Sequence, residues 1–169
     1  LMTQASAADF QPDEVLRLLN RHGVRYVLIG GLAAILHGSP SVTRDIDICH
    51  ASDPGNLLRL ADALREVNAR LRGAPAGLPF RLDAKTLANG DSFTFSTDVG
   101  ALDILATPAG TTGYDDLIRT ADKVEAFDEE FAVASLDDLI RMKRAAGRPK
   151  DRIELEILGA LREEIDRGS

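Results

Sequence analysis

The chain has 169 residues, of which 44% are hydrophobic and 28% are charged. These values are typical of a soluble protein with one compact domain, and they exclude a disordered chain, a collagen-like repeat and a disulfide-stapled mini-protein. The 27 acidic residues outnumber the 20 basic ones, so the net charge is -7 and the average field repels nucleic acid. A polyanionic partner would therefore have to bind a local basic patch.

Cysteine content and hydropathy indicate the compartment. Cys49 is the only cysteine, so no internal disulfide can form, and no charged segment followed by an apolar one opens the chain. We therefore expect a reducing, cytoplasmic setting. No apolar run approaches the roughly 20 residues that a membrane-spanning helix needs, so we expect a soluble protein without a membrane span.

The N-terminal part alternates helices and strands. Apolar spacing, acidic first-turn residues and glycine stops predict a helix over 12–21, a strand over 24–29, a helix over 32–36 after Gly30-Gly31, a break at 37–40 and a strand over 45–49. A longer amphipathic helix is predicted over 56–71.

The C-terminal part begins with strands and ends with helices. The patterns predict strands over 80–87, 92–97 and 101–106, a helix over 114–120, a short hairpin over 123–127 and 130–134, a helix over 135–146 and a last helix that opens at Pro149. Asn89-Gly90 predicts a hairpin turn between the first two of these strands. This order favours an α/β or α+β fold, with a mixed sheet covered by helices.

Three aspartates are candidate metal ligands. Asp45 and Asp47 are separated by one residue on a predicted strand, so they project from one face, roughly 6 to 7 Å apart between Cα atoms. Asp103 lies between apolar residues on a later strand that could neighbour the first. Carboxylates on half-buried strands demand a partner, and an all-oxygen cluster selects Mg²⁺ over zinc. The alternative is a solvated strand face, which is the commoner reason for an Asp-x-Asp pair.

Gly30 and Gly31 lie between a predicted strand and a predicted helix. Without Cβ atoms, their backbone amides could approach a phosphate at the helix N-terminus. The alternative is a tight strand-to-helix turn, since no Gly-x-Gly-x-x-Gly or Walker pattern is present.

These motifs together resemble a known family. The segment 26–34, followed by His37-Gly38 and by Thr43-Arg44-Asp45-Ile46-Asp47, is similar to the signature of the DNA polymerase β-like nucleotidyltransferases, closest to the small bacterial AbiEii-type related to abortive-infection toxins. Segments 135–140 and 146–151, with Lys143 between them, resemble that subgroup's C-terminal helices. The resemblance spans about residues 24 to 160. It departs at Ser41, where relatives often carry an arginine, so either Arg44 takes that role or the nucleotide is held differently.

The resemblance implies one nucleotidyltransferase domain over 1–169, with a catalytic sheet core over 24–134 and a helical part over 135–167. It implies an enzyme of the EC 2.7.7 type that transfers a nucleoside monophosphate from an NTP to an acceptor hydroxyl. Two Mg²⁺ ions would be held by Asp45, Asp47 and Asp103, the last of which could accept the acceptor's proton. The nucleotide would be bound by Gly30, Gly31, Arg44, Lys143, Arg148 and Lys150. Without the resemblance, the last three basic residues would be interpreted as an ordinary basic helix end.

The sequence is compatible with three classes of acceptor: a tRNA end, a protein side chain or a small molecule. The resemblance suggests the toxin of a toxin–antitoxin pair, with a cognate antitoxin as partner. Two alternatives remain, a nucleotide-binding module without catalysis and a non-enzymatic module whose acidic face binds a protein. His37 is predicted to cap a helix, and Cys49 and Tyr26 to pack, so we leave them out of the site.

Overall fold

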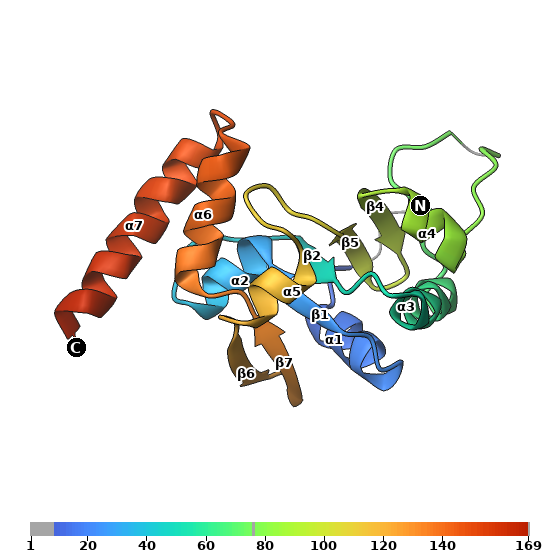
Figure 1. The fold of residues 1–169 in the computed structure, drawn as a ribbon, viewed down its shortest axis with the longest axis horizontal. Helices are drawn as coiled ribbons and strands as arrows, with labels where there is room; N and C mark the ends of the chain where they lie inside the picture. The colour runs from blue at the N-terminus through green and yellow to red at the C-terminus, as the bar shows by residue number, and fades with distance from the viewer. Residues whose placement is uncertain (1–8, 76, 169) are drawn as a thin grey trace, which may run out of the picture.

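The computed structural model describes residues 9–75 and 77–168. Its centre is a seven-stranded sheet in the order β3-β4-β5-β2-β1-β7-β6 (Figure 1). The strands are β1 (Tyr26–Ile29), β2 (Asp45–His50), β3 (Arg70–Leu71), β4 (Ser92–Thr97), β5 (Gly100–Leu105), β6 (Asp122–Ala126) and β7 (Glu129–Val133). The helices are α1 (Pro12–Arg21), α2 (Gly30–Leu36), α3 (Pro54–Glu66), α4 (Ala84–Asn89), α5 (Tyr114–Ile118), α6 (Leu136–Ala146) and α7 (Asp151–Gly168).

The sheet is mixed, as the sequence predicts. β1 runs antiparallel to β2 and parallel to β7, while β2 runs parallel to β5. In the β2–β5 register, Asp47 lies opposite Asp103 and Asp45 lies opposite Ala101. Two strands that are far apart in the chain are thereby placed side by side at the centre of the sheet.

Alternation along β2 and β5 separates a core face from a polar face. Ile46, Ile48, Leu102 and Ile104 are at most 1% exposed and belong to the main hydrophobic core. Because successive side chains point to opposite faces of a strand, the aspartates between them emerge on the other face. Burial of the aliphatic residues thus orients the carboxylates.

The C-terminal helices form a pair at one end of the sheet. α6 and α7 pack against each other, and α6 also contacts α2 (Figure 1). The Ser135 side chain caps α6 by accepting a hydrogen bond from the Asp138 amide, as the sequence pattern predicts. No helix in the described part of the chain has both the length and the apolar character needed to cross a bilayer.

The predicted strand over 80–87 and the predicted hairpin turn at Asn89-Gly90 are both wrong. Residues 80–87 do not form a strand: α4 begins after Asp83, whose carboxylate accepts a hydrogen bond from the Thr86 amide at 2.8 Å. Asn89 and Gly90 therefore end a helix, and the antiparallel hairpin joins β4 to β5 instead.

The helix predicted over 56–71 is also shorter than expected. α3 ends at Glu66, and Asn68 follows with a φ of 53°, which reverses the chain. Arg70 and Leu71 then pair with β4 as the edge strand β3. The other predicted elements are confirmed with ends shifted by about two residues.

Candidate active site

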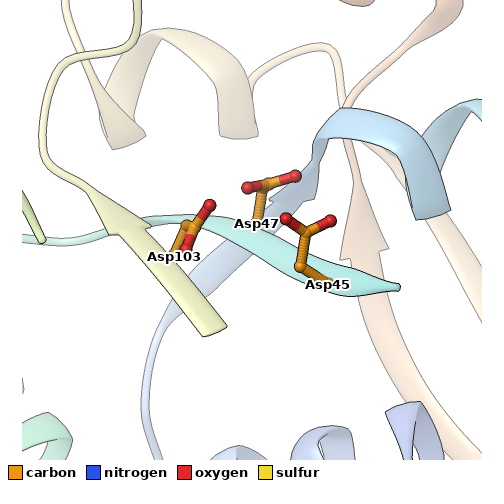
Figure 2. Close-up of side chains that lie close together, drawn as sticks. All are labelled: Asp45, Asp47 and Asp103. Atoms are coloured by element: carbon orange, nitrogen blue, oxygen red, sulfur yellow. The ribbon is translucent and has the colours of Figure 1, made fainter. Parts of the chain in front are cut away.

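Three carboxylates meet on the polar face of the sheet. Asp45 and Asp47 project from β2 and Asp103 from β5, and one oxygen from each lies within 4.8 Å of the others. All three are half-buried. Figure 2 shows the three side chains rising from the same side of the sheet. The structure therefore brings together the three predicted metal ligands.

The electrostatics of the cluster call for a cation. Burial, a hydrogen bond to Asp103 and the negative charges of Asp103 and Asp45 raise the pKa of Asp47 to about 8, and Lys143 only partly opposes this shift. At neutral pH Asp47 therefore keeps its proton unless a compensating positive charge is bound. Carboxylate oxygens on rigid strands fit a hard divalent cation such as Mg²⁺.

One cation of this chain already touches the cluster. The guanidinium of Arg72 lies 2.7 Å from Oδ1 of Asp103 and also donates to the Phe95 carbonyl at 2.8 Å. Arg72 is not among the predicted site residues, because the helical pattern of residues 56–71 places it directly after a long helix. Only the pairing of β3 with β4 brings Arg72 to the aspartates.

The Gly30-Gly31 turn lies directly against the carboxylates. Gly30 has a φ of +73°, and a Cβ there would lie 2.2 Å from Oδ2 of Asp47. A Cβ on Gly31 would lie 3.0 Å from Oγ1 of Thr43, a hydroxyl that hydrogen-bonds Oδ1 of Asp45 at 3.1 Å. Both glycines are thus needed for the close approach of the α2 backbone to β2.

A second group of charges faces the aspartates from α6 and α7. Nζ of Lys143 lies 3.3 Å from Oδ1 of Asp151, and Nε of Arg148 lies 2.9 Å from Oδ2 of the same carboxylate. The Asp151 side chain is 1% exposed. Hydrogen bonds from Arg148, followed by those from Lys143, lower the pKa of Asp151 to about 2. Asp151 therefore holds both cations in place.

Asp151 lies within the 146–151 motif but is not among the predicted site residues. A signal was present, because an aspartate three residues after a basic residue at a helix start can bond back to it. Its burial, which makes it the common partner of two cations, depends on the packing of α7 against α6.

Several of these groups line one cleft of about 540 Å³, whereas Asp45, Arg72 and Asp151 lie outside its lining. Gly30, Gly31, Asp47, Asp103, Lys143 and Arg148 all contribute to its surface. An apolar wall completes it, formed by Leu105, Pro108, Ala109, Leu139, Met142, Ala146 and Leu158. The volume is in the range of small-molecule sites, and a few convergent polar groups on an apolar lining are typical of them.

Two of the predicted nucleotide contacts lie outside this cleft. Arg44 and Lys150 are exposed and do not line it, so their assignment as nucleotide contacts stays a prediction. Ser41 does line it, and its hydroxyl donates to Oε1 of Glu154 at 3.2 Å. His37 ends α2 and hydrogen-bonds the Ala134 carbonyl at 2.8 Å, while Cys49 is fully buried.

Comparison with known proteins gives a structural match and no sequence match. Neither a protein-family model nor a curated protein sequence matches this chain. The lincosamide antibiotic adenylyltransferase LnuA, solved with lincomycin bound, is similar with a TM-score of 0.58 and 16% identity, over 90% of this chain and 99% of that one. TM1012 of Thermotoga maritima, a proposed nucleotidyltransferase, is similar with a TM-score of 0.55 and 17% identity, over 97% and 99% of the two chains. The chain has a nucleotidyltransferase fold.

The nucleotidyltransferase fold confirms what the motifs imply about architecture, a mixed sheet flanked by helices with further helices at the C-terminus. The closer relationship to the AbiEii-type proteins stays a prediction. Within the fold, Asp47, Asp103, the Gly30-Gly31 turn, Lys143 and Arg148 line the same cleft.

Proposed function

We propose that this protein is a metal-dependent nucleotidyltransferase of the EC 2.7.7 type, which transfers a nucleoside monophosphate from an NTP to an acceptor hydroxyl. The observation that carries the proposal is the arrangement of one cleft. Three carboxylates that can share a cation lie beside a glycine turn and opposite two anchored cations. Phosphoryl chemistry of this kind depends on positioning and on charge stabilisation, and this cleft provides groups for both.

Asp45, Asp47 and Asp103 are the proposed ligands of Mg²⁺, with two ions as the expected number. Bound divalent cations would neutralise the phosphates and stabilise the attacking and leaving oxygens. The residues themselves supply rigid oxygen donors, because β2 and β5 are held by parallel pairing at the centre of the sheet. Thr43 further restrains Asp45 through its hydroxyl.

The triphosphate would lie between the glycine turn and α6. Backbone amides of Gly30 and Gly31 would bind phosphate oxygens, and Lys143 and Arg148 would add positive charge. Because Asp151 already orients both cations, little side-chain entropy is lost when the anion binds. These charges would also stabilise the departing pyrophosphate.

In the reaction, the acceptor oxygen would form a bond to the α-phosphorus while the bond from that phosphorus to the α–β bridging oxygen breaks. The electron pair leaves with pyrophosphate, and the acceptor proton passes to Asp103. The fold shared with an adenylyltransferase of lincosamide antibiotics supports a small molecule as acceptor. A tRNA end, a protein acceptor and a toxin role with a cognate antitoxin rest on the motif resemblance alone.

The test is transfer of label from each of four α-labelled NTPs in the presence of Mg²⁺. Total tRNA, the protein itself and small hydroxyl compounds are offered as acceptors. Wild type should label one acceptor, and Asp47→Asn should lower the rate at least about a hundredfold. Asp128→Asn is the matched control, since Asp128 is exposed in the β6–β7 turn. NTP binding without transfer in wild type would contradict the proposal and favour a nucleotide-binding module.

A further inference from the structure

The polar face of the sheet continues beyond Asp103 towards the edge strand β3. Thr94 of β4 lies opposite Asp103, and Ser96 lies opposite both Ala101 and Arg70. Cross-strand partners project from the same face and lie about 5 Å apart. Arg70, Ser96 and Thr94 therefore share the face of the carboxylates.

Arg72, two residues after Arg70, lies on the same face opposite Thr94. Its amide donates to the Thr94 carbonyl at 2.9 Å, so it follows the β3–β4 register. Its guanidinium contacts the Asp103 carboxylate, so the Arg72 side chain lies on the face that carries the three aspartates. The outer part of the face thus carries two arginines next to two hydroxyls.

Some charged and hydroxyl groups of this face have no ion pair or side-chain hydrogen bond among the described residues. Arg70 is exposed and makes no ion pair with any residue in 9–75 or 77–168. The hydroxyls of Thr94 and Ser96 have no side-chain hydrogen bond within the same residues. Arg72 has one acidic partner, Asp103, and a cation bound to Asp103 would compete with it. The Arg72 guanidinium beside Asp103 and the Arg70 guanidinium on the edge strand are then both available on this face.

The position of these arginines separates them from the donor side. The proposed triphosphate contacts are Lys143 of α6 and Arg148 of the loop between α6 and α7, and both are tied to Asp151. Arg70 of β3 and Arg72, which directly follows β3, lie across Asp103 from them, along the sheet. In a transfer reaction the acceptor enters opposite the leaving pyrophosphate, so this side is the acceptor side.

We propose that Arg70 and Arg72, with the hydroxyls of Thr94 and Ser96, form the acceptor subsite, and that the acceptor is a small hydroxyl compound that carries a phosphate group. This inference rests on the proposed nucleotidyl transfer. Guanidinium forks bind phosphate in a bidentate manner, and hydroxyls complete the set of donors. The net charge of -7 disfavours a long nucleic acid, whereas two arginines match one phosphate.

The experiment measures phosphate binding while the donor site is filled. The full chain is loaded with Mg²⁺ and an α,β-methylene analogue of the NTP that it binds, and glycerol 3-phosphate is then titrated by NMR. Glycerol is the uncharged counterpart. A short RNA oligonucleotide forms a separate arm, which distinguishes a nucleic-acid phosphate from a small ester.

Glycerol 3-phosphate should bind and glycerol should not. Arg70→Gln should weaken this binding about tenfold and leave binding of the NTP analogue unchanged. Arg119→Gln is the matched control, because its side chain is 74% exposed and its acidic neighbour, Asp116, lies at 3.9 Å. This variant should bind like wild type.

Equal binding by Arg70→Gln and wild type would overturn the inference, as would binding of the RNA alone or no binding of glycerol 3-phosphate. If the NTP analogue binds in each of these cases, the donor site stands and only the acceptor assignment fails. If no NTP analogue binds, the proposed function itself fails.

Discussion

Replacing Asp47 with asparagine should stabilise the metal-free protein at alkaline pH. The pKa of Asp47 is raised to about 8 from 3.8 because the carboxylate is buried beside Asp103 and Asp45. The folded state therefore retains a proton that the unfolded chain releases near pH 4. The free energy of unfolding falls as pH rises across this window and levels off above about pH 8.

The expected size follows from the shift. One pKa unit corresponds to about 1.4 kcal/mol, so between pH 5 and pH 8 this group should reduce the stability of wild type by about 3 to 4 kcal/mol. Asparagine has a similar shape and no charge to desolvate, so Asp47→Asn should lack this part of the pH dependence. The gain in stability would accompany a loss of transfer activity.

The assay is urea unfolding at pH 5 and pH 8 with a chelator present, for wild type, Asp47→Asn and Asp128→Asn. Wild type and the Asp128 control should lose stability in parallel, and Asp47→Asn should lose about 3 to 4 kcal/mol less. Parallel profiles for all three proteins, or lower stability of Asp47→Asn at pH 8, would refute the reasoning about the acid cluster.

Two further substitutions test the elements around the cluster. Gly30→Ala should destabilise the fold by about 1 to 2 kcal/mol by urea unfolding, because its φ is +73° and its Cβ would overlap Asp47. Gly159→Ala, in α7 with open space around it, should be neutral or stabilising by up to about 1 kcal/mol, and equal effects of the two would contradict this account. Asp151→Asn should destabilise by about 1 to 3 kcal/mol at pH 7 through weaker bonds to Arg148. Because the pKa of Asp151 is lowered to about 2, the difference from wild type should shrink as pH falls from 4 towards 2, and a constant difference would argue against an ionic role.

Local patterns were enough to find the centre of the site. Alternation places Asp45 and Asp47 on one face of a strand whatever the partners of that strand are. Gly30-Gly31 follows a predicted strand and precedes a predicted helix, so the sequence also predicts that these glycines form the turn between them. That β2 pairs with β5 was only an expectation, because such a pairing joins segments more than fifty residues apart and no local signal sets it.

The errors lie where local signals conflict or where tertiary pairing decides. Asn89-Gly90 is a common hairpin sequence, yet the Asp83 cap makes the preceding residues helical. Residues 67–71 continue a helical apolar pattern, and the edge pairing with β4 overrides it. Arg72 was missed for this reason, since its contact with Asp103 exists only once β3 lies beside β4.

The most direct test of nucleotidyl transfer compares the fate of two labels in the same NTP. The NTP is labelled either at the α-phosphate or at the γ-phosphate and is incubated with Mg²⁺ and the acceptors named above. The α label should appear on the acceptor and the γ label in pyrophosphate, and Asp47→Asn should form both products at least about a hundredfold more slowly. Transfer of the γ label to the acceptor, or equal products from wild type and Asp47→Asn, would contradict the assignment of this cleft to nucleotidyl transfer.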